Sequence, residues 1–381
     1  MPFLDHAATT PLDPRVAALL VQLQSAPLNA SSVHQHGQRA RAILEEARSI
    51  TGECLRIDPK NIVFTASATE ANNLAIRGVA ARVRAMLRRP IRILTSNLEH
   101  ACVRETIADL QRREAAEATL MGVDEDGCAK LPEVKPLDAP DLLCLMAVQN
   151  ETGIIQQLKV AREFCGFMGA HWLCDITQAV GVMDCGHDQI GAHLYSLSSH
   201  KIYGPCGVGV LAGELVPHLT PQITGGPQEN NRRAGTQPVA LIRAFAEALQ
   251  LATAERDERA SHLQQLVART EEKLRAANVP FRISGDPARR APGFLNLCID
   301  NLTGPDLVIA LDARGFSISS GAACSTGVME ISPAMAAMFP SDEPRAAAAV
   351  RITPGKETTI QQIDDLVNAI AAISSLGTRI S

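Results

Sequence analysis

Two residues of opposite charge stand where an amine and a carboxylate could share one site. Lys201 lies in Ser-His-Lys-Ile-Tyr-Gly-Pro, whose apolar and glycine-rich neighbours are unusual for a solvated lysine. Asp175 ends the apolar run that comes before the one leading to Lys201. A lysine that can form an imine and a carboxylate that can hold a pyridinium nitrogen are the two groups that pyridoxal 5'-phosphate (PLP) requires. Alone, Lys201 would be an ordinary surface lysine, and only the pair indicates a cofactor.

Polar residues also follow the other apolar runs of this region. Ligands of an open parallel sheet bind beyond the carboxyl ends of its strands, so these residues are expected to face one site. Thr69 opens a helical pattern and could bind a phosphate there, although a simple N-cap is the commoner role of such a threonine. His100 could stack on a ring or cap a helix. The polar stretches are 67–69, 99–100, 149–151, Asp175 with Gln178, and 198–201.

Cys324 is the candidate nucleophile. It lies in Ser-Ser-Gly-Ala-Ala-Cys-Ser-Thr-Gly, a small and polar stretch suited to a mobile loop, whereas most of the other nine cysteines resemble inert core residues. The ten cysteines are scattered without any Cys-x-x-Cys spacing, so thiols are expected rather than disulfides, and no metal site is expected.

The elements that must position these residues follow from the apolar pattern. Short apolar runs alternate with helical patterns between about residues 60 and 215, which predicts a parallel sheet covered by helices. A smaller α+β unit is expected after the charged helix over 254–277. The expected strands are 61–65, 91–95, 142–148, 171–175, 194–197, 207–211, 281–284 and 293–299, and the other expected helices are 38–50, 71–87, 160–169, 239–254, 305–313 and 360–373.

Composition narrows the classes of protein that fit. The 381 residues carry a formal net charge of −5 without a block of like charge, so a nucleic-acid-binding surface is not indicated. The longest apolar stretch, 142–148, is far shorter than the roughly 20 residues that span a bilayer. The first residues show no pattern of a signal peptide. A cytoplasmic protein without membrane contact is therefore expected.

Seven motifs in this chain, taken in order, resemble those of the PLP-dependent cysteine desulfurases, the NifS/IscS-like branch of the class V aminotransferase superfamily. The similarity runs from residue 3 to about residue 370. The motifs are Phe3-Leu-Asp-His-Ala-Ala-Thr-Thr-Pro, Asn29-Ala-Ser-Ser-Val-His34, Phe64-Thr-Ala-Ser-Ala-Thr-Glu-Ala-Asn-Asn73, Asn150-Glu-Thr-Gly-Ile-Ile-Gln156, Ser198-Ser-His-Lys-Ile-Tyr-Gly-Pro205, Arg233-Ala-Gly-Thr236 and Ser319-Ser-Gly-Ala-Ala-Cys324.

The resemblance implies a role for each matching residue. Lys201 would form the imine with PLP, and Cys324 would accept the substrate sulfur as a persulfide. Arg351 would grip the substrate carboxylate in a bidentate fork, with Asn29 supporting that contact. The remaining residues implied to serve the cofactor are Asp175 at the pyridine nitrogen, Gln178 and Asn150 at the phenolic oxygen, His100 stacked on the ring and active in proton transfer, and Thr69, Ser198, His200 and, from the neighbouring subunit, Thr236 at the phosphate.

The implied fold is the α/β fold of PLP fold type I, with a mostly parallel seven-stranded sheet in a large domain over 15–255. A smaller α+β domain would comprise 1–14 and 256–381. The implied activity converts L-cysteine to L-alanine and passes the sulfur through the enzyme persulfide to an acceptor protein, for iron-sulfur cluster assembly or thiolation of RNA or cofactors, and the enzyme is expected to be a homodimer. The alternatives are a cysteine/cystine lyase or aminotransferase that does not use Cys324, and a catalytically silent homologue.

Overall fold

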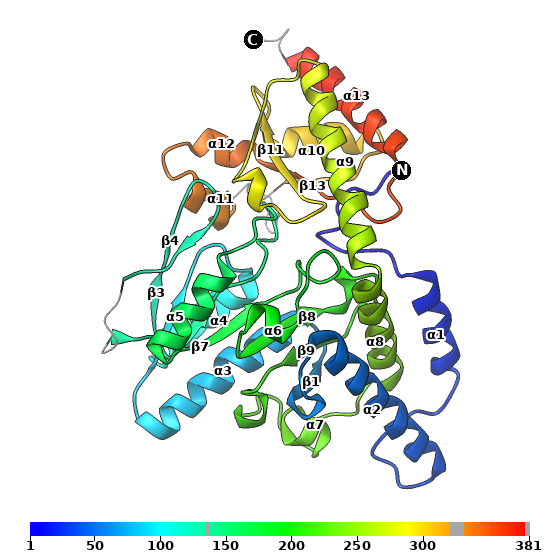
Figure 1. Ribbon diagram of the computed structural model, residues 1–381, viewed down its shortest axis with the longest axis vertical. Helices are drawn as coiled ribbons and strands as arrows, with labels where there is room; N and C mark the ends of the chain where they lie inside the picture. Colours follow the sequence, from blue (N-terminus) through cyan, green and yellow to red (C-terminus); the bar gives the residue numbers. More distant parts are fainter. Residues whose placement is uncertain (134–137, 321–330, 378–381) are drawn as a thin grey trace.

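A seven-stranded sheet forms the centre of the larger half of the molecule, in the order β1-β9-β8-β7-β6-β2-β3. The computed structural model describes residues 1–133, 138–320 and 331–377 (Figure 1). Within the sheet β9 alone runs antiparallel to its neighbours, and the other pairs are parallel. The strands are β1 Ile62–Thr65, β2 Ile91–Thr95, β3 Ala116–Leu120, β6 Leu142–Cys144, β7 His171–Asp175, β8 Leu194–Ser198 and β9 Gly209–Ala212.

Helices cover both faces of this sheet because its strands are apolar on both sides. Leu142 and Cys144 pack into the apolar cluster formed with α3 and α4, while Leu143 packs into the opposite cluster with α2, α5 and α8. Both faces are therefore closed to water, and only the strand ends remain open for a site. The helices of this half are α1 Pro14–Gln24, α2 Gln35–Leu55, α3 Ala68–Leu87, α4 Ala101–Arg112, α5 Leu158–Met168, α6 His187–Ile190, α7 Gln228–Asn231 and α8 Val239–Ala254.

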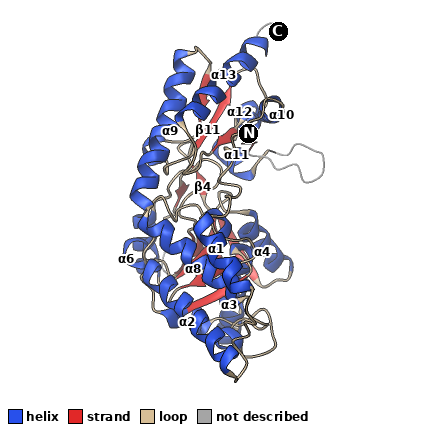
Figure 2. Cartoon of the chain, turned by 90° about the vertical axis from the view of Figure 1, so that its right-hand side faces the viewer, coloured by secondary structure: helices blue, strands red, loops and turns tan. Residues whose placement is uncertain are grey.

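A four-stranded antiparallel sheet, in the order β10-β11-β13-β12, lies in the other half of the molecule. Figure 2 shows the two sheets one above the other, with α9 running alongside. The N-terminal residues join this half, because the Leu4 N–H donates to the Ser317 carbonyl at 2.9 Å and Phe3 forms a parallel bridge with Ser317. Its main elements are α9 Arg256–Ala276, β10 Phe281–Ile283, β11 Leu295–Ile299, α10 Gly304–Asp312, β12 Ser319–Ser320, α11 Pro333–Met338, α12 Glu343–Ala348, β13 Val350–Ile352 and α13 Ile360–Gly377.

The predicted α/β fold with a seven-stranded, mostly parallel sheet is confirmed, with two differences in its strands. The edge strand β3 was not predicted, because Ala-Glu-Ala-Thr-Leu is half exposed and carries a weak apolar pattern. The strand expected over 142–148 ends at Cys144. Beyond that point the Leu145 N–H still donates to a carbonyl group of β7. The Ala147 N–H donates to the carbonyl group of the last residue of β7. The division into domains of 15–255 and of 1–14 with 256–381 remains a prediction.

Two features complete the fold. A small hairpin, β4 Gly122–Val123 with β5 Ala129–Lys130, extends from the large half, and single-turn 3₁₀ helices occupy Pro59–Asn61, Ser199–Lys201, Val216–His218 and Pro287–Arg289. Among the described residues, no helix combines the length and the apolar character needed to cross a membrane.

Candidate active site

A cavity of about 420 Å³ opens at the carboxyl ends of β6, β7 and β8, the edge of the sheet where the polar residues were expected to meet. Most of the predicted site residues line it, together with Ala7 and Ala8 from the N-terminal segment. The fold thus brings together residues from seven separate stretches of the sequence. The predicted residues in its wall are Thr69, His100, Asn150, Asp175, Gln178, Ser198, His200, Lys201 and Arg351.

Lys201 ends the 3₁₀ turn that directly follows β8. Its Nζ donates hydrogen bonds to the carbonyl oxygens of Ala7, at 2.6 Å, and Ala8, at 2.5 Å. Burial, reinforced by the positive charge of Arg351, lowers the pKa of the Lys201 amine to about 8. A substantial fraction of the amine is therefore neutral near physiological pH, the form in which an amine can act as a nucleophile or base.

Asp175 is the last residue of β7 and is 8% exposed. Its Oδ1 accepts the Thr177 N–H at 2.9 Å, and its Oδ2 accepts an N–H from the Asn72 side chain at 2.8 Å. These two bonds hold the carboxylate in one orientation at the floor of the cavity. Asn72 was not predicted as a site residue, although a polar side chain on the buried face of α3, beside Ala75 and Ile76, was a usable signal.

His100 caps α4, one of the two roles considered for it, and it also lines the cavity, while its stacking on a ring remains a prediction. The Nδ1 atom accepts the Cys102 N–H at 3.2 Å and lies 3.0 Å from the Cys102 sulfur. Because Nδ1 is an acceptor in this cap, the neutral ring carries its proton on Nε2. Burial lowers the pKa of His100, which favours this neutral form. Cys102 was not predicted at the site, and burial raises its pKa to about 12, so its sulfur stays protonated.

Glu99, the residue before His100, is 2% exposed and lies close enough to Asp175 to feel its charge. Its Oε1 accepts the Met146 N–H at 2.7 Å. Burial, together with the nearby charge of Asp175, raises the pKa of Glu99 to about 8. Glu99 therefore carries a proton at neutral pH and adds little negative charge below the site.

The N-terminus of α3 forms another wall of the cavity. Ser67 is the N-cap, since its Oγ accepts the Glu70 N–H at 3.3 Å, and the helix begins at Ala68. Thr69 is therefore not the cap and lies in the first turn of α3, with its side chain at the cavity. Ser198 and His200 face the same cavity, and burial lowers the pKa of His200 to about 4. A helix N-terminus beside hydroxyl groups is suited to an anion such as a phosphate.

Arg351, on β13, reaches the cavity from the small sheet and is 7% exposed. One terminal nitrogen, Nη2, donates to Asp5 Oδ1 at 2.6 Å, and the other, Nη1, donates to the Asn150 carbonyl at 2.6 Å. Its Nε is buried and has no hydrogen-bond partner among the described residues. A donor is therefore left for a further acceptor. The partnership with Asp5 was not predicted, because the two residues are separated by 346 positions.

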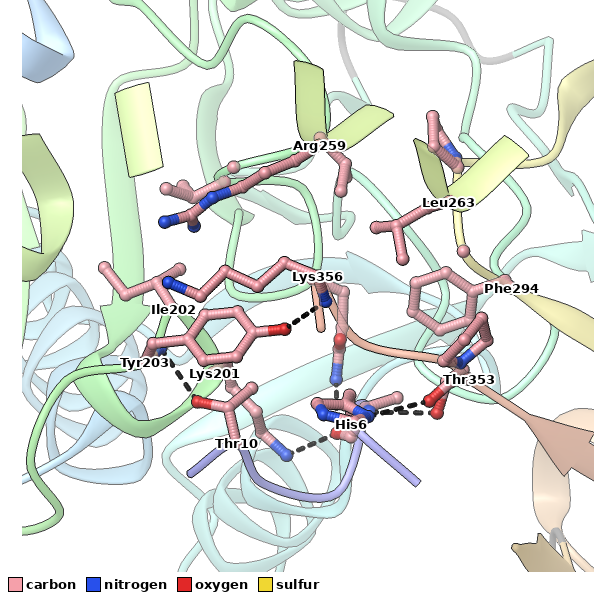
Figure 3. Close-up of a pocket in the computed structure, with 18 of the residues that line it drawn as sticks. His6, Thr10, Lys201, Ile202, Tyr203, Arg259, Leu263, Phe294, Thr353 and Lys356 are labelled. Atoms are coloured by element: carbon pink, nitrogen blue, oxygen red, sulfur yellow. Dashed lines mark hydrogen bonds between the residues drawn. The ribbon is translucent and has the colours of Figure 1, made fainter. Parts of the chain in front are cut away.

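The remaining wall of the cavity is held in place by hydrogen bonds to the N-terminal segment. Gln178 donates from Nε2 to the Ala7 carbonyl at 2.9 Å, the same oxygen that accepts from Lys201. A second cavity of about 70 Å³ lies behind this wall (Figure 3). There the Tyr203 ring contacts Arg259, with 5.3 Å from the guanidinium carbon to the ring centroid, and Lys356, with 4.7 Å from its nitrogen to the centroid. The backbone next to Lys201 is thus firmly packed.

Two predicted residues lie elsewhere, and a third is outside the described residues. Asn29 is exposed between α1 and α2, where its Oδ1 accepts the Ser31 N–H, and Thr236 is exposed in the segment after α7. Neither lines the cavity of its own chain. Cys324 lies outside the described residues, although Ser319 pairs with Arg351 in the sheet and Ser332 Oγ donates to Glu151 Oε1 at 2.7 Å. The described residues on either side of 321–330 are thus attached next to the cavity.

Comparisons of this chain with family models and with known proteins agree on one family. The aminotransferase class-V model matches residues 2–366. A cysteine desulfurase IscS from Klebsiella pneumoniae subsp. pneumoniae is 34% identical over 376 residues, which cover 97% of this chain and 91% of that protein. A putative cysteine desulfurase IscS 1 from Bacillus subtilis is 33% identical over 374 residues, which cover 97% of this chain and 98% of the relative. The chain belongs to the cysteine desulfurase family.

The solved structures agree with this membership. A NifS-like protein superimposes with a TM-score of 0.90 at 27% identity, covering 98% of this chain and 99% of the other. Cysteine desulfurases, like other class-V aminotransferases, are PLP-dependent enzymes. The chain is therefore an enzyme of this PLP-dependent class, as predicted.

The cavity of this cysteine desulfurase has the donor set that PLP requires. A partly neutral lysine and a fixed carboxylate lie in one wall, and a helix N-terminus with hydroxyl groups lies in another. Thr177 lines the cavity, and its hydroxyl oxygen is buried without a hydrogen-bond partner among the described residues. An orphaned polar atom of this kind is costly unless a further group satisfies it. The residues therefore fit the cofactor.

Proposed function

We propose that this chain binds PLP through Lys201 and uses it to remove the sulfur of L-cysteine, leaving L-alanine and a persulfide on Cys324. The observation that carries the proposal is the meeting of Lys201, Asp175 and Arg351 in one cavity, although they come from the turn after β8, the end of β7 and the middle of β13. When bound, PLP supplies an electron sink for the substrate Cα. The other contributions come from the residues of this chain.

Asp175 and the α3 end of the cavity would orient the cofactor. The Asp175 carboxylate, held by Asn72 and Thr177, would face the pyridine nitrogen. Thr69, Ser198 and His200 would bind the phosphate, aided by the free N–H groups of α3. Gln178 and Asn150 would contact the phenolic oxygen, and His100 would stack on the ring. These assignments are supported by the position of all these residues around the same cavity.

Arg351 would bind the carboxylate of cysteine. Its buried Nε has no partner among the described residues, and its charge lies close enough to Lys201 to lower the pKa of that amine. The substrate carboxylate would thus anchor the amino acid with its Cα near the lysine that moves the proton. Asn29, exposed and outside this cavity, would support the contact only from another chain.

Cys324 would take the sulfur as a thiolate. A bond forms between the Cys324 sulfur and the substrate sulfur while the substrate Cβ–S bond breaks, and its electron pair stays on carbon, which is protonated to give alanine. One cysteine and one enzyme thiol thus become one alanine and one enzyme persulfide. The attachment of Ser319 beside Arg351 and of Ser332 to Glu151, next to Asn150, supports this role, because both flanks begin at the cavity.

The tautomer of His100 limits how it can assist. Because Nδ1 accepts in the helix cap, the neutral ring presents an Nε2–H to the cavity and can donate a hydrogen bond there. It cannot remove a proton at Nε2 without first exchanging this tautomer, and it can give up a proton only after it has become an imidazolium. We therefore assign His100 the role of hydrogen-bond donor and ring partner, and deprotonation of the Cys324 thiol to another group.

The test measures the products formed from cysteine by the parent enzyme and by the Cys324→Ala variant. The parent should form alanine, and alkylation followed by peptide mass analysis should find the extra sulfur on Cys324. The variant should bind cysteine and change the cofactor spectrum but form neither alanine nor persulfide. Cys298→Ala, at a buried cysteine of β11, is the matched control and should turn over normally. Alanine formation by Cys324→Ala at the parental rate would instead identify a lyase.

Three further parts of the proposal concern partners and location. The enzyme would act as a homodimer, would pass its persulfide sulfur to an acceptor protein, and would work in the cytoplasm. Thr236 and Asn29 support the dimer, because both are exposed and lie away from the cavity of their own chain. Sedimentation of the cofactor-loaded enzyme measures its oligomeric state. Capture of the persulfide-bearing enzyme from the native extract identifies the acceptor protein bound to it.

A further inference from the structure

The segment that contains Thr236 is held by an unusual turn. Three consecutive residues of α7, Glu229, Asn230 and Asn231, adopt left-handed backbone angles, with φ of 48°, 55° and 63°. Non-glycine residues seldom adopt this conformation, and three in a row require strong support from their surroundings. Figure 1 shows α7 at the end of the molecule beside β1 and α2.

The Glu229 carboxylate supplies that support. It is 3% exposed and accepts two hydrogen bonds of 2.9 Å from the Arg48 guanidinium, which is 4% exposed. It also accepts the Phe64 N–H of β1 at 2.9 Å and an N–H of the Gln237 side chain at 2.5 Å. A buried carboxylate with four donors is fully satisfied, so it fixes α2, β1 and the α7 turn relative to one another.

Thr236 is held on both sides by this turn. Gln237, which follows it, is bound by Glu229, and the N–H of Gly235, which precedes it, donates to Gln228 Oε1 at 3.1 Å. The Thr236 side chain itself is exposed and has no hydrogen-bond partner among the described residues. A residue whose neighbours are fixed and whose exposed hydroxyl has no partner in the described part of the chain is accessible to a group outside its own chain.

A second ion pair connects the same segment to the cavity of its own chain. Arg233 donates from Nε to Glu70 Oε1 at 2.9 Å, and Glu70 Oε2 accepts the Ala66 N–H at 2.8 Å. Glu70 directly follows Thr69, which lines the cavity. The segment is therefore attached at two points, the buried Glu229 and the N-terminus of α3.

We propose that Glu229, held by Arg48, is a positioning residue that presents the Thr236 hydroxyl to the phosphate group bound by a second copy of this chain. The inference rests on the proposed function and extends it, because it names the side chains that would hold Thr236 in place for its expected contact across the subunit boundary. Thr236 contacts the phosphate, whereas Glu229 acts only through the turn. Loss of either should weaken PLP binding in the partner subunit and leave the cavity of its own subunit intact.

The first experiment compares PLP affinity of homodimers. The cofactor-free enzyme is titrated with PLP, reduced with borohydride, and the fraction of Lys201 carrying a pyridoxyl group is measured by mass spectrometry. Thr236→Ala should bind PLP roughly ten- to a hundredfold more weakly, as expected for a lost hydrogen bond to a charged group. Glu229→Gln should weaken binding in the same direction. The double variant should be no more than about twofold weaker than Thr236→Ala, because both changes remove one contact.

The second experiment places the changes on different chains by co-expression with two affinity tags. In one mixed dimer, Lys201→Ala stands on one chain and Glu229→Gln on the other. The intact Lys201 then receives Thr236 from a chain with a normal turn, and its affinity for PLP should equal that of the parent. In the other, both changes stand on the same chain, and the intact Lys201 of the unaltered chain should bind PLP as weakly as in the Glu229→Gln homodimer.

Controls separate positioning from damage to the fold. Glu271→Gln breaks an ion pair with Arg290 of similar burial, 12% and 11% exposed, in the other half of the molecule, and should lower thermal stability without changing PLP affinity. Gln237→Ala removes only the link between Glu229 and the neighbour of Thr236, and should show a smaller effect of the same kind in the mixed dimers.

Several outcomes would overturn the proposal. A reversed pattern in the mixed dimers would show that Glu229 serves its own cavity, and unchanged affinity in Glu229→Gln would show that the turn positions nothing. A fully loaded monomer in sedimentation would contradict any contact between subunits. If the parent enzyme binds no PLP at Lys201, the proposed function itself is wrong, which is a different result from normal binding without an effect of Glu229.

Discussion

Asp5 and Arg351 form an ion pair of 2.6 Å at the wall of the cavity, although they come from opposite ends of the chain. Asp5 belongs to the N-terminal segment whose carbonyl groups also hold Lys201, and Arg351 belongs to the small sheet. The residue proposed to bind the carboxylate of the substrate therefore already has a carboxylate of the protein as its partner. In the proposed function, substrate and Asp5 would compete for the same positive charge.

Asp5→Asn is expected to lower the KM for cysteine by a few-fold. Removal of the Asp5 charge leaves Arg351 as a poorly compensated buried cation, so the incoming carboxylate gains more from binding. The measurement is the rate of alanine formation over a range of cysteine concentrations. Asp364→Asn, which breaks the ion pair with Arg269 far from the cavity, is the control and should leave KM unchanged. A KM that rises in Asp5→Asn would show that Asp5 orients Arg351 for the substrate.

Arg351→Ala is expected to raise the KM for cysteine by about thirtyfold or more while the enzyme still binds PLP. Loss of one partner of a buried charge pair costs roughly 2 to 5 kcal/mol. PLP content and the cysteine dependence of alanine formation are measured on the same preparation. Arg290→Ala, at an arginine that is 11% exposed in its side chain, provides a control of similar burial. An unchanged cysteine dependence would remove Arg351 from the substrate site.

Asp175→Asn is expected to slow exchange of the Cα proton of cysteine with solvent more strongly than it weakens PLP binding. The cofactor loses the charged partner of its ring nitrogen, whereas the contacts to its phosphate remain. Deuterium incorporation into cysteine and a PLP titration give the two quantities. In Asn72→Ala the carboxylate stays but loses the 2.8 Å bond that orients it, so a smaller loss is expected. Exchange at the parental rate in Asp175→Asn would contradict its proposed role.

The pKa of Lys201 predicts how capture of PLP by the cofactor-free enzyme depends on pH. Below its pKa of about 8 the amine is mostly protonated, so the rate should rise with pH and level off above about pH 9. Stopped-flow absorbance follows the reaction. In Arg351→Ala a positive charge that lowers this pKa is missing, so the profile should move to higher pH. A rate in the parent that still increases between about pH 9 and 10 would indicate an ordinary lysine.

Much of the candidate site could be predicted from local patterns. Lys201, Asp175 and His100 each follow an apolar run, and parallel strands bring their carboxyl ends to one edge of a sheet. The strand β3 escaped prediction because an edge strand needs little apolar character. One of the two roles considered for Thr69 was the N-cap of α3, a position that Ser67 occupies in the structure. Two hydroxyl residues so close together have similar propensities for the N-cap position.

Local sequence alone therefore determined the alternation of strands and helices and the polar residues at the strand ends, because backbone geometry depends on neighbouring residues. The tertiary structure alone decided which side chains became partners. Asp5 with Arg351, Asn72 with Asp175 and Arg48 with Glu229 are each joined across more than 100 positions, at 346, 103 and 181. Such contacts depend on how the packed layers bring distant segments together, and no local periodicity records that arrangement.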